Sequence, residues 1–153
     1  MKIRALYDKF ENVASWLQSP LLLVIRLYWG VSFVQTGWGK LMHLDRTAAY
    51  FTDLGLPVPK VNAFMAGSTE CFGGLLLAVG LFARGAAVPL IFCMIVAYAT
   101  ADGEALRAIF SDTDKFTGAT PFLFLYAALI VLAFGPGKLS LDSLIFRKAP
   151  AAK

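Results

Sequence analysis

The chain has 153 residues, of which 58% are hydrophobic and only 16% charged, and its mean hydropathy is +0.67. Soluble domains carry about a quarter charged residues, so this composition excludes an ordinary aqueous fold and indicates a membrane protein. The net charge of +4 does not indicate nucleic-acid binding, because the basic residues are scattered between apolar runs and form no basic stripe.

Residues 1–18 predict an amphipathic helix that lies in the membrane interface. Apolar side chains recur there at helical spacing: Ile3, Leu6, Tyr7, Phe10, Val13, Ala14 and Leu17. A frayed tail beside the membrane is the alternative. A signal peptide is not indicated, because the first long apolar run begins only near residue 20 and is too long for a signal core.

Four apolar segments are long enough to cross about 30 Å of hydrocarbon, which takes roughly 17–25 helical residues. They lie at about 20–39, 61–82, 85–101 and 120–136. None shows the period-two alternation of barrel strands, so all four predict helices. Pro20 and Pro121 are expected in first turns, each behind an N-cap, Ser19 or Thr120. Pro89 is expected to bend the third span.

The expected fold is therefore all-α: an integral membrane four-helix bundle in a single domain (1–153), preceded by the N-terminal amphipathic interfacial helix. The link at about 40–60 predicts a short surface helix that begins near Asp45 and ends at Gly55. The link at about 102–119 predicts a further short interfacial segment.

The distribution of Lys and Arg predicts the orientation in the membrane. One side carries Lys2, Arg4, Lys9, Arg84, Lys138, Arg147, Lys148 and Lys153. The other side carries fewer: Lys40, Arg46, Lys60, Arg107 and Lys115. The positive-inside rule then places both termini in the cytoplasm and both long links outside.

Arg26 and Glu70 are full charges within predicted spans, where a charge costs at least about 2.5–3.5 kcal/mol. Helical geometry places Arg26, Gly30, Phe33, Gly37 and Lys40 on one face of the first span. Glu70 shares a face with Ala63, Ala66, Gly67, Gly73, Gly74 and Leu77, small enough for another helix to approach. Counted from the span ends, Arg26 and Glu70 lie about 9 Å apart in depth, so we expect them to pair, with Lys40 as the competing partner of Glu70.

Such a pair either holds the bundle together or lines a polar ligand pocket. Gln35, nearly opposite Arg26, and Trp38, near the outer interface, are further candidates beside such a pocket. For Trp38, aromatic anchoring at the interface is the favoured alternative. His43 is the only histidine and predicts no metal site, because no Cys, Asp or Glu ligands cluster with it. Proton handling by His43 with Asp102 or Glu104 is an alternative.

Two cysteines, Cys71 and Cys93, lie at similar depth in neighbouring spans and are expected to be buried free thiols. The chain contains no CxxC, phosphate loop or nucleophile elbow, so covalent catalysis has no candidate residue.

The segments RLYWGVSFVQTGWGKL (26–41), AAYFTDLGLPVP (48–59), ECFGGLLLAVGLFAR (70–84) and MIVAYATA (94–101) resemble the DoxX family of small bacterial membrane proteins. The resemblance covers about 26–136 and implies a four-helix inner membrane protein, often a partner in redox systems that use quinones or handle thiols. Many relatives carry a histidine near the end of the third helix, where this chain has Thr100 and Asp102.

Three functions follow as hypotheses. The first is a redox subunit of the bacterial inner membrane that binds a quinone between the first two spans, using Arg26, Gln35, Lys40 and Glu70 beneath Trp38. The second is a non-catalytic scaffold for partner oxidoreductases or maturation enzymes, and the third is a small transporter, which would need a homo-oligomer because four short helices leave little room for a path.

Overall fold

The computed structural model describes the backbone of residues 2–146, most of which is helical. The order is α1 (Lys2–Met42), α2 (Leu44–Asp53), α3 (Pro59–Val79), α4 (Ala83–Thr100), α5 (Gly103–Arg107), α6 (Thr113–Gly118), α7 (Thr120–Phe134) and α8 (Leu141–Ile145). Met1 and residues 147–153 lie outside the described residues. Three of the cations counted for the membrane orientation are among them: Arg147, Lys148 and Lys153. So do the side chains of Lys2, Ile3, Ala5 and Leu6, two of which belong to the predicted amphipathic face.

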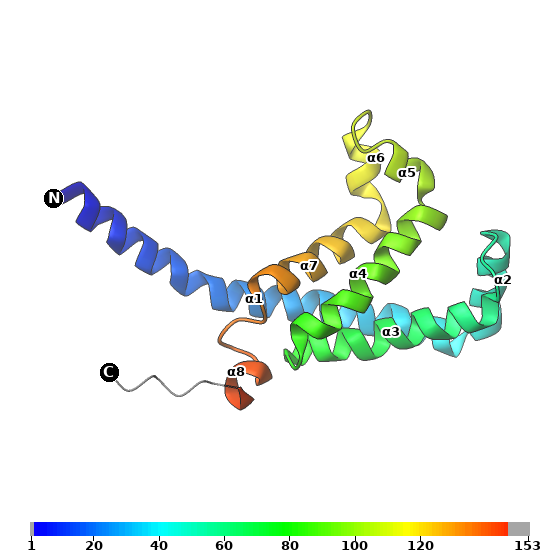
Figure 1. The fold of residues 1–153 in the computed structure, drawn as a ribbon, viewed down its shortest axis with the longest axis horizontal. Coiled ribbons are helices and arrows are strands. Elements are labelled where there is room, and N and C mark those ends of the chain that lie inside the picture. Colours follow the sequence, from blue (N-terminus) through cyan, green and yellow to red (C-terminus); the bar gives the residue numbers. More distant parts are fainter. Residues whose placement is uncertain (1, 147–153) are drawn as a thin grey trace.

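The four long helices pack as two antiparallel pairs, α1 with α3 and α4 with α7 (Figure 1). The pairs meet mainly where α3 contacts α4 and α1 contacts α7. They lie close together near α8 and diverge toward the opposite end, which carries α2, α5 and α6 (Figure 1). We call these two ends the α8 end and the α2 end. A cavity, described below, lies between the diverging pairs, and we call this region the wedge.

Two helices are long and apolar enough to cross a membrane, α1 over Tyr7–Met42 and α4. The apolar helix α7 has only 15 residues. Helix α3 has 21 residues but is less apolar, because Asn62 and Glu70 interrupt its hydrophobic sequence. All four predicted spans are thus helical, and the predicted short helix of the first link is present as α2.

Helix α1 runs unbroken through the position where the sequence predicted a helix start. The prediction that Ser19 caps a helix beginning at Pro20 is wrong, because Pro20 lies inside α1. An internal proline removes one backbone hydrogen bond but does not have to end a helix. Ser19 Oγ instead accepts a hydrogen bond from the backbone N–H of Lys138 at 3.3 Å. The predicted amphipathic segment is therefore continuous with the first span.

The predicted positions of the other two prolines within their helices are confirmed. Pro121 lies in the first turn of α7, but Ala119 is the N-cap residue, so the prediction that Thr120 caps this helix is wrong by one position. Pro89 lies inside α4, as expected.

Small residues bring α1 and α3 into close contact. A Cβ placed on Gly37 would lie 2.4 Å from the backbone N of Cys71, and one placed on Gly30 would lie 2.8 Å from the carbonyl oxygen of Gly74. These distances are far below van der Waals contact, so both positions require glycine. The predicted small-residue faces of the two helices are confirmed as the surfaces on which they pack.

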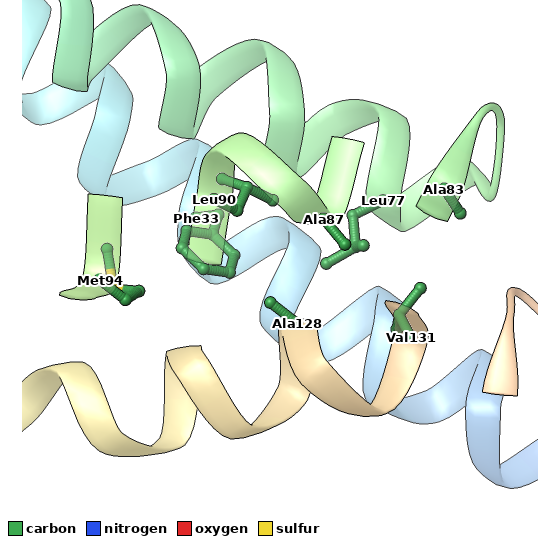
Figure 2. Close-up of a cluster of buried hydrophobic side chains, with 8 residues drawn as sticks. All are labelled: Phe33, Leu77, Ala83, Ala87, Leu90, Met94, Ala128 and Val131. Carbon is green, nitrogen blue, oxygen red and sulfur yellow. The ribbon is translucent and has the colours of Figure 1, made fainter. Parts of the chain in front are cut away.

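The buried core joins the two helix pairs (Figure 2). Its members are Phe33, Leu77, Ala83, Ala87, Leu90, Met94, Ala128 and Val131. Figure 2 shows them between the ribbons of all four long helices. Three of them are alanines, whose small side chains allow α4 and α7 to approach closely near the α8 end.

Candidate functional site: an ion pair beside an amphipathic cavity

Glu70 is almost completely buried, with 4% of its surface exposed, and it forms an ion pair with Lys40. Lys40 Nζ donates a hydrogen bond to Glu70 Oε2 at 2.5 Å. The packing of α1 on α3 explains this partnership. Gly37 lies directly against Cβ of Glu70, and Lys40 is one helical turn farther along α1. The competing partner that the sequence suggested is thus the one that Glu70 uses.

The ion pair borders a cavity of about 630 Å³ in the wedge between the helix pairs. On the α1–α3 side the cavity is partly polar, with Thr36, Lys40, Asn62, Thr69 and Glu70. On the opposite side it is mostly apolar, with Pro89, Phe92, Cys93, Met94, Val96, Ala97, Pro121 and Phe124. Tyr50, Phe51 and Leu54 of α2 contribute a further apolar wall. The volume is typical of small-molecule sites.

Some of the apolar residues that line the cavity on α3 and α4 are also exposed at the surface of the molecule. Met65 of α3 and Phe92 of α4 both line the cavity, and they are 59% and 66% exposed. In a membrane, exposed apolar side chains on these helices face lipid.

Arg26 is fully buried but lies far from Glu70, so the predicted pair between these two residues is wrong. A Cβ placed on Gly80, at the end of α3, would collide with Arg26 Nη1, which locates the guanidinium near the α8 end. Gly37, which faces Glu70, is eleven residues along α1 from Arg26, or about 16 Å. The sequence-based depth was too small because it depended on assumed span ends.

The guanidinium of Arg26 binds the segment that follows α7. Its Nη2 donates a hydrogen bond to the carbonyl oxygen of Leu139 at 2.5 Å, while Nε and Nη1 have no hydrogen-bond partner within residues 2–146. Asp142, three residues farther on, accepts hydrogen bonds from the backbone N–H groups of Phe82 and Ala83 at 2.7 and 3.1 Å. We call residues 137–145 the strap, because these contacts tie them to α1 and to the start of α4.

Most of the other residues that the sequence suggested for the site lie outside the cavity. Gln35 and Trp38 are exposed on α1 and do not line the cavity. His43 is exposed and is the N-cap residue of α2. Asp102 lies at the cavity edge, and among the cysteines Cys93 lines the cavity but Cys71 does not.

Three polar residues line the cavity that were not predicted from the sequence: Thr36, Asn62 and Thr69. A signal for Thr36 was available, because it lies four residues before Lys40 and so shares its helical face. Thr69 and Asn62 carry no such signal, since the wedge that exposes them depends on how α4 diverges from α3.

Exposed ion pairs lie at the α2 end, outside the predicted spans. Lys60 Nζ is 2.8 Å from Asp45 Oδ1 and lowers the pKa of that carboxyl group. Lys115 Nζ is 2.9 Å from Glu104 Oε2, an interaction that lowers the pKa of Glu104 and raises that of Lys115. Solvent screens both pairs, so they contribute little to stability.

The buried pair of Lys40 and Glu70, unlike the exposed pairs, has hydrogen-bonding groups that face a cavity. An ammonium group has three N–H donors, and one N–H of Lys40 is used by Glu70. Among the described residues, no other group bonds to Lys40 Nζ or to the second carboxylate oxygen, Oε1, so a second N–H and Oε1 are available to a ligand. The site thus combines one hydrogen-bond donor and one acceptor at the edge of a mostly apolar space, which suits an uncharged molecule with a polar head.

Comparison with known proteins finds a matching family and several related membrane proteins. The DoxX family model matches residues 21–103. The chain is 32% identical to a membrane protein of Mycobacterium tuberculosis, Rv3486, over 86% of this chain and 85% of the relative. It is 30% identical to the inner membrane protein YphA of Escherichia coli, over 80% and 88% of the two chains.

A third relative is CatD of Bacillus subtilis, which is provisionally named an oxidoreductase. It is 27% identical over 82% of this chain and 87% of its own length. No solved structure matches the chain significantly. The family match covers more than half of the chain, so this protein is a membrane protein of the DoxX family.

Proposed function

We propose that this protein is a membrane subunit of a redox system and that it binds a quinone or a similar hydrophobic redox ligand in the cavity of the wedge. One observation carries the proposal: the buried ion pair of Lys40 and Glu70 borders a mostly apolar cavity of about 630 Å³. Intramembrane charges are rare and usually mark a functional site.

The pair suits both redox states of such a ligand. A quinone carbonyl accepts a hydrogen bond from Lys40, and a quinol hydroxyl donates one to Glu70. The ring then lies against the apolar side of the wedge, beside Phe92 and Phe124. A long apolar tail leaves the cavity between Met65 and Phe92 and stays in lipid.

The proposed binding site differs from the one predicted from the sequence, which lay between the first two spans. The ligand lies between the two helix pairs, and Gln35, Trp38 and Arg26 take no part in holding it. The provisional naming of the B. subtilis relative as an oxidoreductase is consistent with a redox role but does not identify the ligand.

We propose further that α1, α3, α4 and α7 all cross the bacterial inner membrane, with both termini in the cytoplasm. The support is the arrangement of the helices, in which α8 and the N-terminal part of α1 lie toward one end and α2, α5 and α6 at the other (Figure 1). Reporter fusions at Lys153 and at Phe110 should report opposite sides, with Lys153 cytoplasmic. A periplasmic signal from Lys153 would contradict this topology.

Binding of a short-chain quinone analogue to the detergent-solubilised protein tests the ligand proposal. Lys40→Met and Glu70→Gln should each weaken binding at least about tenfold, which corresponds to the loss of one charge-assisted hydrogen bond. Gln35→Ala is the matched control, because Gln35 is on α1 but outside the cavity, and it should bind like the wild type. If well-folded wild-type protein neither binds the analogue nor co-purifies with a quinone, the ligand proposal fails.

A scaffold function is the second candidate, and the N-terminal part of α1 favours it. Phe10, Trp16 and Leu17 are 68%, 82% and 66% exposed on a helix that extends beyond the bundle (Figure 1). Exposed large apolar side chains mark surfaces that contact proteins or membrane. Trp16→Ser combined with Leu17→Ser should then impair the activity of partner redox enzymes in membranes and leave analogue binding unchanged.

A further inference from the structure

A second hollow adjoins the cavity at the α2 end. It has a volume of about 730 Å³ and is wide open to the surroundings. Charged side chains of α5, α6 and the link before them line it: Asp102, Glu104, Arg107, Asp114 and Lys115. Thr100, Ala101 and Asp102 line both hollows. The polar hollow and the amphipathic cavity are therefore neighbours that share lining residues where α4 ends.

The α8 end is filled instead. Leu77, Leu90 and Val131 are completely buried in the core between the two helix pairs. Beyond the core, Arg26 is also completely buried, and its guanidinium bonds to the strap at Leu139. Tight packing and a bound strap thus separate the cavity from this end.

We infer that water and protons reach the Lys40–Glu70 pair from one side of the membrane only, the side of α5 and α6, through a mouth formed by Thr100, Ala101 and Asp102. A charged pair next to a hydrated passage costs less than a pair surrounded by dry protein and lipid. The charged residues of the outer hollow keep that passage wet.

The titratable groups that line the cavity come from α1, α2, α3, α4 and the link after α4, while α7 contributes none: Lys40, Tyr50, Glu70, Cys93 and Asp102. The importance of this route rests on the proposed function, because a redox ligand that takes up or releases protons at the pair would exchange them with that side alone. The route itself is a property of the cavity and can be tested without a ligand.

Cys93 is a natural reporter of access, because it lines the cavity while Cys71 does not. A charged, membrane-impermeant methanethiosulfonate forms a mixed disulfide with an accessible thiolate and releases a sulfinate, so mass spectrometry detects a fixed mass increase. The reagent is added to right-side-out and to inverted membrane vesicles that contain the full-length Cys71→Ala protein. We expect modification of Cys93 in one vesicle orientation only.

Two exposed positions identify the sides. Asp114→Cys on α6 and Ser15→Cys on α1, each in a protein with Cys71→Ala and Cys93→Ala, report the α2 end and the opposite side. Cys93 should react in the orientation in which Asp114→Cys reacts, and Cys71 in the Cys93→Ala protein should react severalfold more slowly than Cys93 does.

Narrowing the mouth sharpens the test. Ala101→Trp should slow modification of Cys93 severalfold, and Thr100→Phe gives a second narrowed mouth if the tryptophan variant does not fold. Ile95→Trp is the matched control, because Ile95 is an exposed residue of α4 that lines neither hollow. Its labelling rate should equal that of the parent protein.

Labelling of Cys93 from the Ser15 side would overturn the inference. Labelling by a membrane-permeant maleimide alone, with no reaction of the charged reagent from either side, would overturn it as well, because the cavity would then open only to lipid. If Cys93 is accessible from the Asp114 side but the protein binds no quinone analogue, the access route stands and the proposed function fails.

Discussion

The two ends of the bundle accommodate a buried charge in different ways. At the α8 end, Arg26 is enclosed by protein, and its identified hydrogen bond goes to a backbone carbonyl of the strap. At the α2 end, Glu70 is neutralised by Lys40 and borders a cavity. The first arrangement closes and fixes one end, while the second leaves polar groups available to a ligand. A buried charge alone therefore does not identify a binding site, because the space beside it decides what it can do.

The contact between α1 and α3 underlies both ends, and disrupting it should have the largest effect. Gly37→Ala places a Cβ 2.4 Å from the backbone N of Cys71, so the helices must separate. We expect a loss of about 3 kcal/mol of unfolding free energy, the upper part of the usual range for overpacking. Gly39→Ala is the control, because nothing lies within 4 Å of its added Cβ. Equal thermal stability of the two variants in detergent would contradict the close packing.

Loss of the Arg26 side chain should release the strap. Arg26→Gln removes the charge-assisted hydrogen bond to Leu139, and we expect a loss of about 2 kcal/mol and faster proteolysis between residues 137 and 146. Binding of a quinone analogue should persist, because Arg26 does not line the cavity. Arg46→Gln, at an exposed position of α2, serves as the control. Unchanged proteolysis of the strap would show that Arg26 does not hold it.

A double-mutant cycle separates the two charged sites. Lys40→Met and Glu70→Gln should be coupled by about 1 kcal/mol, because each removes the partner of the other. Arg26→Gln and Glu70→Gln should be additive within about 0.5 kcal/mol, as expected of distant residues. Thermal or denaturant unfolding of the single and double variants measures both terms. A coupling energy between Arg26 and Glu70 well above about 0.5 kcal/mol would contradict their separation and support the ion pair that the sequence suggested.

The smallest effect is expected from the exposed pair of Glu104 and Lys115. Lys115 lowers the pKa of Glu104 from 4.5, so the stabilisation is present above that value and is lost as the pH falls through the lowered pKa. Glu104 raises the pKa of Lys115 from 10.5, so the stabilisation is lost again as the pH rises through the raised pKa. Melting temperatures of wild type and Glu104→Gln should differ slightly at neutral pH and converge in acid. Asp114→Asn is the control: if the ion pair is responsible, the difference in melting temperature between this variant and the wild type should not shrink in the same way in acid.

Sequence patterns predicted the parts of the fold that depend on local periodicity. The small-residue faces of α1 and α3 could be predicted because glycine spacing follows the helical repeat, and α2 because Asp45 and Gly55 mark its ends. Pro20 was misleading, since proline favours a first turn but is tolerated inside a long helix.

The site was harder to predict, because it depends on how helices are placed relative to one another. The partner of Glu70 follows from the register of α1 on α3, and a change of a few residues in an assumed span end moves Arg26 by several ångströms. The cavity depends on the divergence of the two helix pairs, which no short sequence motif encodes. Lys40 and Glu70 were therefore identified as candidates, whereas Thr36 and Thr69 were not.

The length of α1 has a mechanical consequence. Its 41 residues give a rod of about 60 Å, roughly twice the thickness of the hydrocarbon layer, and no loop interrupts it. The segment that lies beyond the bundle is thus part of the same helix as Lys40 (Figure 1), with Pro20 removing one backbone hydrogen bond between them. A displacement of that segment therefore reaches the ion pair through a single helix, by way of Pro20, with no loop between them to absorb the movement.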